Sequence, residues 1–179
     1  KAEKENNDSI VISSADTKDA TNITLEIPVS AAQNIAENSN LSIEVETTSG
    51  NVSISNETLN SIVEQIGTDE NIKVAVETKT AENVFEAVSE ESAKTITENV
   101  DRDTLEKSVI VEVNITTGDK HIRSFGGHKL TVDVPVDGKG HIEGKHYKVH
   151  IISADGKMDT TFGKCISKEG KLVIKVDTT

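Results

Sequence analysis

The sequence predicts a mainly β protein with a few short helices, arranged as a β-sandwich-like fold of two related β units in tandem. Apolar and polar residues alternate in many short segments, which is typical of antiparallel strands with one buried face. Valine and isoleucine dominate the apolar residues, and both favour strands. A partial internal repeat is the third observation, and it predicts the two related units.

The alternating segments predict strands with one apolar face, at residues 23–27, 41–45, 52–54, 72–76, 109–115, 130–134, 147–151 and 172–176. The dipeptides Ser49-Gly50, Asp137-Gly138 and Asp155-Gly156 lie between such segments and predict tight turns between antiparallel strands. Two stacked sheets would remove the apolar faces from water. At about 25 cal/mol per Å², this burial is expected to be the main stabilising contribution.

Three further segments have the apolar spacing of helices. The first helix is predicted to be capped by Ser30, and the second to be capped by Ser55 or Asn56 and to stop at Gly67. The apolar faces of the three helices are formed by Ala32, Ile35 and Ala36, by Leu59, Ile62, Val63 and Ile66, and by Ala81, Val84, Phe85 and Val88. Residues 89–107 are polar and acidic, so they are interpreted as a weak helix or a linker.

The internal repeat consists of ordered pairs of segments about 100 to 107 residues apart. The paired segments are 23–29 with 130–136, 43–52 with 149–158, and 71–80 with 170–179. The first pair contains the only two prolines of the chain, Pro28 and Pro135. The predicted organisation is therefore a disordered or linker segment at 1–9, a first β unit with two short helices at 10–80, a helical or linker connection at 81–107, and a second β unit at 108–179. Whether the two units share one core is left open.

The charge and hydropathy of the chain argue against two classes of partner. Asp and Glu number 31 against 19 Lys and Arg, for a net charge of −12, which disfavours binding to nucleic acid. No apolar run approaches the roughly 20 residues that span a bilayer, so no membrane insertion of this segment is expected. The chain opens without a signal peptide, and we expect it to be a domain cut from a longer protein.

Five histidines fall within one stretch of thirty residues: His121, His128, His141, His146 and His150. His146 and His150 are expected to project from the same face of a strand as Lys148, as an exposed pair. Because no cysteine or helical His-x3-His context accompanies them, the histidines are interpreted as solvent-side residues, and no metal site is predicted. Acidic loop residues that could ligate calcium, namely Asp101, Asp103, Asp137 and Asp155, are interpreted as turn residues instead.

Two other features could supply reactive groups. The single cysteine, Cys165, lies in an alternating segment and is interpreted as a buried strand residue, because no pattern supplies a base for it. Residues 124–127 form a glycine-containing loop without the GxxxxGK[ST] pattern of a phosphate-binding loop. The sequence therefore predicts no catalytic residue, no cofactor, no metal site and no enzyme activity.

An ordered set of segments extends over residues 10 to 179: ITLEIPVSAAQNIAE, LSIEVETTSGNVSIS, ETLNSIVEQIG, NIKVAVETK, SVIVEVNITTGDKHIRSFGGHKLTVDVPV, YKVHIISADGKMDTT and GKLVIKVDTT. Together they resemble a β-rich module of large cell-surface proteins in Gram-positive, clostridial-type bacteria. In those proteins the module commonly lies near S-layer homology repeats or cell-wall anchors. The resemblance implies an extracellular, cell-surface or cell-wall location. It assigns no catalytic residue. Surface domains of this kind can contain an intramolecular Lys–Asn isopeptide bond beside a buried carboxylate, and the sequence neither predicts nor excludes one here.

The function expected from the sequence is that of a non-catalytic, extracellular structural or adhesive module that acts as a spacer, in presentation or in protein–protein attachment. Its expected partners are neighbouring domains of the same surface protein, another surface protein or a glycan. The alternative is a carbohydrate-binding or polysaccharide-degradation accessory module. That alternative is disfavoured because sugar sites usually offer an aromatic platform. The chain has four aromatic residues, Tyr147 and the three predicted core residues Phe85, Phe125 and Phe162.

Overall fold

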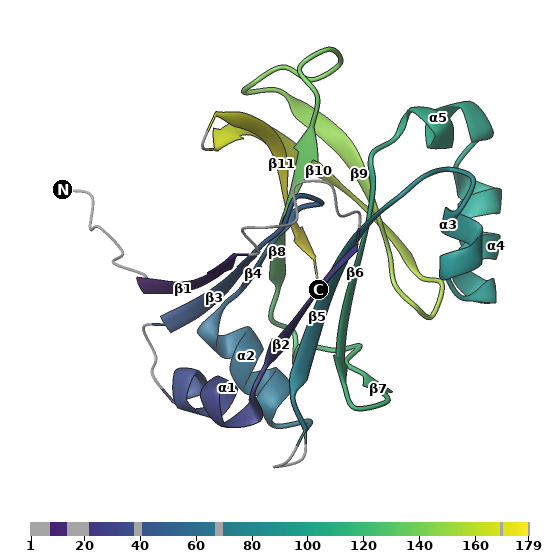
Figure 1. Cartoon of the computed structure of the whole chain (residues 1–179). Coiled ribbons are helices and arrows are strands. Elements are labelled where there is room, and N and C mark those ends of the chain that lie inside the picture. The colour runs from purple at the N-terminus through teal and green to yellow at the C-terminus, as the bar shows by residue number, and fades with distance from the viewer. Residues whose placement is uncertain (1–7, 14–21, 38–40, 67–69, 169, 179) are drawn as a thin grey trace.

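The chain forms a mainly β, sandwich-like structure with two sheets and several short helices (Figure 1). The computed structural model describes residues 8–13, 22–37, 41–66, 70–168 and 170–178. Within these ranges there are eleven strands and five helices. Residues 1–7 of the predicted linker and the predicted helix stop at Gly67 lie outside the described residues.

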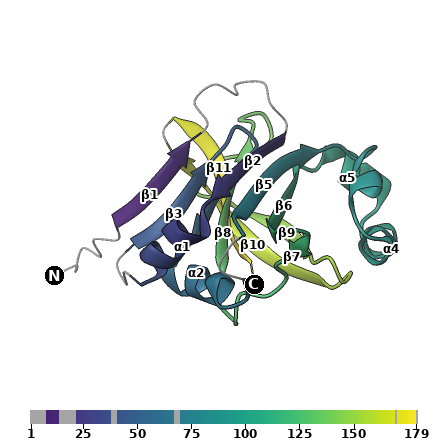
Figure 2. The same ribbon diagram turned by 60° about the horizontal axis from the view of Figure 1, so that its bottom comes forward.

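The larger sheet has seven strands and combines strands from both halves of the chain. Their order is β1 (Asp8–Ser13), β3 (Leu41–Glu46), β4 (Asn51–Ile54), β8 (Leu130–Val136), β11 (Lys171–Thr178), β10 (Met158–Lys168) and β9 (His146–Ile152). Strand β1 runs parallel to β3, whereas every other neighbouring pair is antiparallel. In Figure 2, β1 and β3 lie at one margin of the molecule.

The smaller sheet has four strands in the order β2 (Asn22–Ile27), β5 (Ile72–Lys79), β6 (Ile110–Thr117) and β7 (Lys120–His121), all antiparallel. Strand β6 pairs with β5 over its full length, from Ile72 opposite Thr117 to Lys79 opposite Ile110. The two predicted units are thus joined by this pairing and by that of β4 with β8, while the division into tandem units stays a prediction.

The main core lies between the inner faces of the two sheets. Its fully buried members on the strands are Ile43, Val45, Val52, Ile54, Ile72, Val74 and Val76. Each belongs to an alternating segment, so the period of two in the sequence directs these side chains inward. A second, smaller cluster contains Cys165, Ile174 and Val176 on β10 and β11. The predicted burial of Cys165 is confirmed.

Helices α1 (Val29–Ala36) and α2 (Asn56–Val63) pack on each other and on β3, at the lower end of Figure 1. Ser55 caps α2 as predicted, because its hydroxyl accepts a hydrogen bond from the Thr58 amide at 3.2 Å. The predicted cap at Ser30 is wrong. Helix α1 already begins after Pro28, whose carbonyl accepts hydrogen bonds from the amides of Ala31 and Ala32 at 3.0 Å each.

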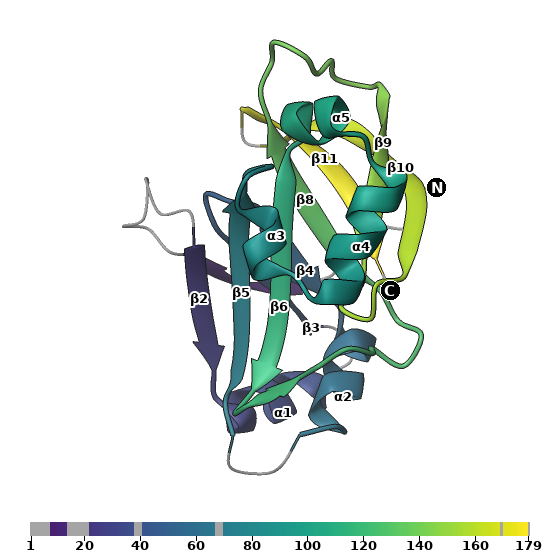
Figure 3. The same ribbon diagram turned by 90° about the vertical axis from the view of Figure 1, so that its right-hand side faces the viewer.

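The connection predicted at 81–107 contains three helices: α3 (Val84–Ala87), α4 (Glu90–Asn99) and α5 (Arg102–Lys107). In Figure 3 these helices form a layer beside β6 and the β9–β10 hairpin. Helix α4 is amphipathic and buries Ile96, and Ser89 caps it through the Ser92 amide at 3.1 Å. The polar composition that indicated a weak element is therefore the solvent face of a capped helix.

Two of the three phenylalanines predicted in the core are exposed, and that prediction is wrong for them. Phe85 is 40% exposed on α3, and Phe162 is 66% exposed on β10. Phe125 alone packs against the main core. Phe162 alternates with Gly163, where an added Cβ would lie 2.3 Å from Ile174 Cγ2. The side of β10 that carries Gly163 thus faces the packed second cluster, which leaves Phe162 on the opposite, outer face.

Candidate functional site

A cluster of three charged side chains crosses the outer face of the seven-stranded sheet. The Lys168 ammonium at the end of β10 donates hydrogen bonds to Glu44 on β3 and to Asp133 Oδ2 on β8, the latter at 3.2 Å. The side chain of Asp133 is 8% exposed and that of Glu44 is 18% exposed. The cluster therefore joins three strands that are far apart in the sequence.

The environment of Lys168 keeps its side chain charged. Burial alone lowers the pKa of the ammonium, but the hydrogen bonds to Glu44 and Asp133 outweigh that effect and raise it above its ordinary value. Asp133 Oδ1 is buried without a hydrogen-bond partner among the described residues. A buried oxygen of this kind costs free energy unless a neighbouring cation compensates for it. Lys168 is the cation that does so.

An open cleft of about 200 Å³ lies beside this cluster. Its lining includes Asn51, Asp133, Lys168 and Lys171, with Pro135 and Val173 as apolar parts of its wall. Ammonium groups, an amide and a carboxylate are therefore available next to an apolar surface. This set can bind a small polar molecule through hydrogen bonds, but it contains no nucleophile with an adjacent general base.

The outer face of β9, β10 and β11 carries a different set of side chains. Lys148 lies opposite Phe162, and Lys164 lies opposite both His146 and Lys175, so these five residues share one face. His150, opposite Thr160, belongs to the same face. The prediction that His146 and His150 project together beside Lys148 is confirmed. All except the half-buried His150 are exposed.

The other histidines do not join this face. His121 lies on the short strand β7, and His128 lies in the loop before β8; both are exposed. His141 stacks against Tyr147, with ring centroids 4.7 Å apart, and its Nδ1 lies 3.6 Å from Asp137. Within the described ranges, no group of three or more His, Cys, Asp or Glu side chains is placed to hold a metal ion.

The acidic residues weighed as calcium ligands have local structural partners. Asp101 caps α5 by accepting a hydrogen bond from the Thr104 amide at 2.9 Å, and the hydroxyl and amide of Thr104 lower its pKa. Asp103 forms an ion pair with Lys107 at 2.6 Å. Asp137 accepts a hydrogen bond from the Gly140 amide at 3.3 Å. Their roles in the described structure are those of turn and helix-end residues.

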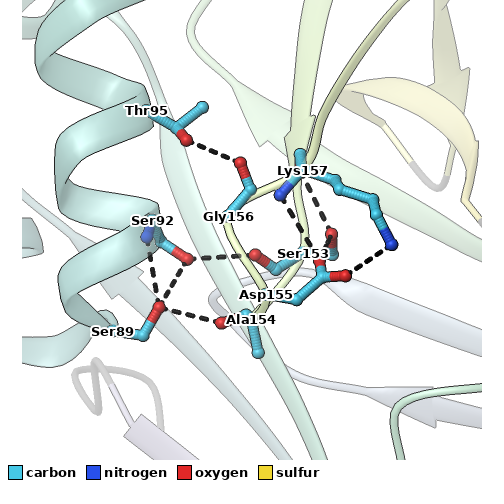
Figure 4. A network of polar contacts seen from close by, with 8 residues as sticks. All are labelled: Ser89, Ser92, Thr95, Ser153, Ala154, Asp155, Gly156 and Lys157. Carbon is cyan, nitrogen blue, oxygen red and sulfur yellow. Dashed lines mark hydrogen bonds and ion pairs between the residues drawn. The ribbon is translucent and has the colours of Figure 1, made fainter.

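Asp155 orders the turn between β9 and β10. It forms an ion pair with Lys157 at 2.7 Å and accepts a hydrogen bond from the Ser153 hydroxyl at 2.6 Å. These partners hold the pKa of Asp155 well below its ordinary value. The bonds fix the carbonyl groups of this turn, which point toward helix α4 (Figure 4).

Helix α4 binds this turn through three hydroxyl groups (Figure 4). Ser89 donates to the carbonyl of Ala154 at 2.8 Å, Ser92 to that of Ser153 at 3.0 Å, and Thr95 to that of Gly156 at 2.6 Å. These bonds dock the helical connection on the β9–β10 hairpin. Sequence reasoning missed this contact, although the spacing of three between the hydroxyl residues is that of one helix face.

Two further findings concern the class of the protein. Within the described residues, no helix combines the length and apolar character that crossing a bilayer requires. Comparisons with models of protein families, with curated proteins and with solved structures found no match.

Proposed function

We propose that this chain is a non-catalytic structural or adhesive module of an extracellular surface protein. The observation that carries the proposal is that partly buried charged groups connect strands of the larger sheet. The ion pairs of Lys168 with Glu44 and Asp133 connect three strands of one sheet. The hydroxyl groups at α4 likewise attach the helical layer to the β9–β10 hairpin. Such ties favour a rigid body that presents surfaces.

The extracellular placement is supported by the sequence resemblance to modules of Gram-positive surface proteins. A surface protein of that kind would position this module beside other domains or a cell-wall anchor, as a spacer or an attachment unit. The net charge of −12 supports the same role, because it keeps densely displayed copies from aggregating.

The test is antibody labelling of intact source cells. An antiserum raised against the purified chain is expected to label unbroken cells as strongly as permeabilised ones. A cytoplasmic protein, labelled in parallel, controls for leakage. Labelling that appears only after permeabilisation would show that the module is not displayed outside the cell.

A carbohydrate-binding accessory role is the second candidate, and the cleft beside Lys168 favours it. Asn51 and Lys171 supply hydrogen-bond donors there, while Pro135 and Val173 supply an apolar surface for a sugar ring. A neutral glycan that binds at this place should lose affinity in Asn51→Ala. A glycan array on which no neutral sugar binds saturably would leave the structural role alone.

A further inference from the structure

The outer face of β9, β10 and β11 differs in charge from the chain as a whole. The chain carries 31 acidic against 19 basic residues. This face nevertheless gathers Lys148, Lys164 and Lys175, which the cross-strand registers place around Phe162. His146 and His150 flank Lys148 on the same strand. We call these six residues the basic face.

Two carboxylates, Asp133 on β8 and Asp177 on β11, lie on the same side of the sheet as the basic face. Asp133 of β8 lies opposite Lys175 of β11, but its carboxylate is bound by Lys168. Asp177 follows Lys175 by two residues on β11 and accepts a hydrogen bond from the Thr131 hydroxyl at 2.8 Å. The lysines of the basic face therefore project to solvent beside an exposed aromatic ring, and Asp133 and Asp177 are the carboxylates near them.

We propose that the basic face binds an acidic polysaccharide. Phe162, 66% exposed, offers a flat apolar surface on which a sugar ring can stack. Lys148 lies opposite Phe162 on β9, and Lys164 follows it by two residues on β10, so both ammonium groups can pair with the acidic groups of neighbouring sugars. Neighbouring strands are about 4.8 Å apart, so ring and ammonium groups fall within the span of one or two sugar units.

Charge complementarity favours this occupant over a neutral glycan. A neutral sugar would leave the three lysines of the basic face with mobile counterions only, whereas a polyanion replaces and releases those ions. A nucleic acid is disfavoured because the remainder of this acidic chain repels a long phosphate backbone. The inference rests on the proposed adhesive role, since it names the ligand class to which the module would attach.

Binding of the full chain to immobilised polygalacturonate at about 0.15 M salt is the direct test. We expect saturable binding that weakens as salt rises. The double variant Lys148→Gln with Lys164→Gln should weaken it at least about tenfold. The matched control is Lys94→Gln, together with Lys107→Gln, which removes the same charge from exposed helical positions and should change affinity by less than about twofold.

Phe162→Ala separates ring stacking from simple charge attraction. It should weaken polygalacturonate binding about five- to tenfold and leave binding to polyglutamate, which has carboxylates without sugar rings, unchanged. A sulfated and a phosphorylated polysaccharide in parallel arms identify which acidic group is preferred. Absence of saturable binding to all three polysaccharides would overturn the proposal. Equal effects of Phe162→Ala on polyglutamate, or tighter binding to single-stranded DNA, would also overturn it.

These outcomes are distinct from those of cell labelling. A displayed module that binds no acidic polysaccharide would retain the proposed surface role and lose only this ligand.

Discussion

Replacing Lys168 with methionine should test how much the charged cluster stabilises the fold. Methionine keeps much of the apolar stem but removes the cation from Glu44 and Asp133. Breaking a fully buried pair costs about 3–5 kcal/mol, and an exposed pair contributes about 0–1 kcal/mol. The three side chains are 30%, 18% and 8% exposed, so the cluster lies between these limits. We expect Lys168→Met to lower the free energy of unfolding by about 2–3 kcal/mol at pH 7.

The effect should depend on pH in a direction that identifies its cause. In Lys168→Met, Glu44 and Asp133 remain as two neighbouring, largely buried carboxylates without a cation, and their negative charges oppose folding. Acid neutralises carboxylates and so removes this unfavourable contribution. The deficit relative to the native chain should therefore shrink between pH 7 and about pH 4.

Urea unfolding followed by circular dichroism measures this difference at each pH. Lys164→Met, an exposed substitution on the same strand, is the control and should change stability by less than about 0.5 kcal/mol. Adding Asp133→Asn to Lys168→Met should recover part of the loss, because it removes the less exposed of the two unpaired charges. A deficit below about 0.5 kcal/mol at pH 7, or one that is the same at low pH, would refute the assigned role.

Three further outcomes follow from local geometry. Gly156 has φ +79°, and an added Cβ would lie 2.7 Å from Glu91 Cβ. Gly156→Ala should therefore lower the free energy of unfolding by about 1–3 kcal/mol and speed amide hydrogen exchange in α4. Unchanged exchange in α4 would contradict the docking of this helix on the turn. Burial and then Lys148 lower the pKa of His150, so the folded state resists its protonation and loses stability as pH falls below about 6.5. His150→Gln should reduce that loss in pH-dependent urea unfolding, whereas His121→Gln on exposed β7 should leave it unchanged. Finally, a protonated Lys168 amine attacks neither an asparagine amide nor a carboxyl group, so intact mass spectrometry should show no isopeptide bond at this lysine; a mass lower by about 17 or 18 Da, localised to Lys168 by fragmentation, would contradict this.

The strands and the α2 cap could be predicted because their causes are local. Ile43 and Val45 point to the buried face of β3, and the residues between and beside them point to the other face. This period of two is visible in any short segment of the sequence. Ser55 binds an amide only three residues away. The start of α1 was misplaced because the carbonyl of Pro28, rather than a side chain, begins the helical hydrogen bonds, and the type of residue does not reveal this.

The charged cluster and the docking of α4 could not be predicted, because they depend on strand order. Lys168 and Glu44 are 124 residues apart in the chain. Whether they can meet depends on the order of the strands in the sheet, which is β3-β4-β8-β11-β10. The exposure of Phe162 did leave a signal. It has the same parity as Lys164 along β10 and the opposite parity to Cys165, so a buried Cys165 implies an outward Phe162.

The repeat within the sequence is matched by the pairing of strands more closely than by their register. Strands β2 and β5 pair antiparallel, as do their counterparts β8 and β11, and β3–β4 and β9–β10 are both antiparallel pairs. Leu25 lies opposite Val74, yet Val132 lies opposite Val176, three residues beyond the counterpart of Val74.

The pairs of strands compared above lie in different sheets, and helices accompany two of the changes of sheet. In the first half, α1 and α2 carry the chain from one sheet to the other and back, so β2 and β5 leave the sheet of β3 and β4. No described helix lies between β8 and β11, and these four strands stay in one sheet, where β10 pairs with β11, whereas β6 and β7 of the same half belong to the smaller sheet. Short loops keep consecutive strands together, whereas crossovers between layers need longer connections. Each half of the chain therefore contributes strands to both sheets.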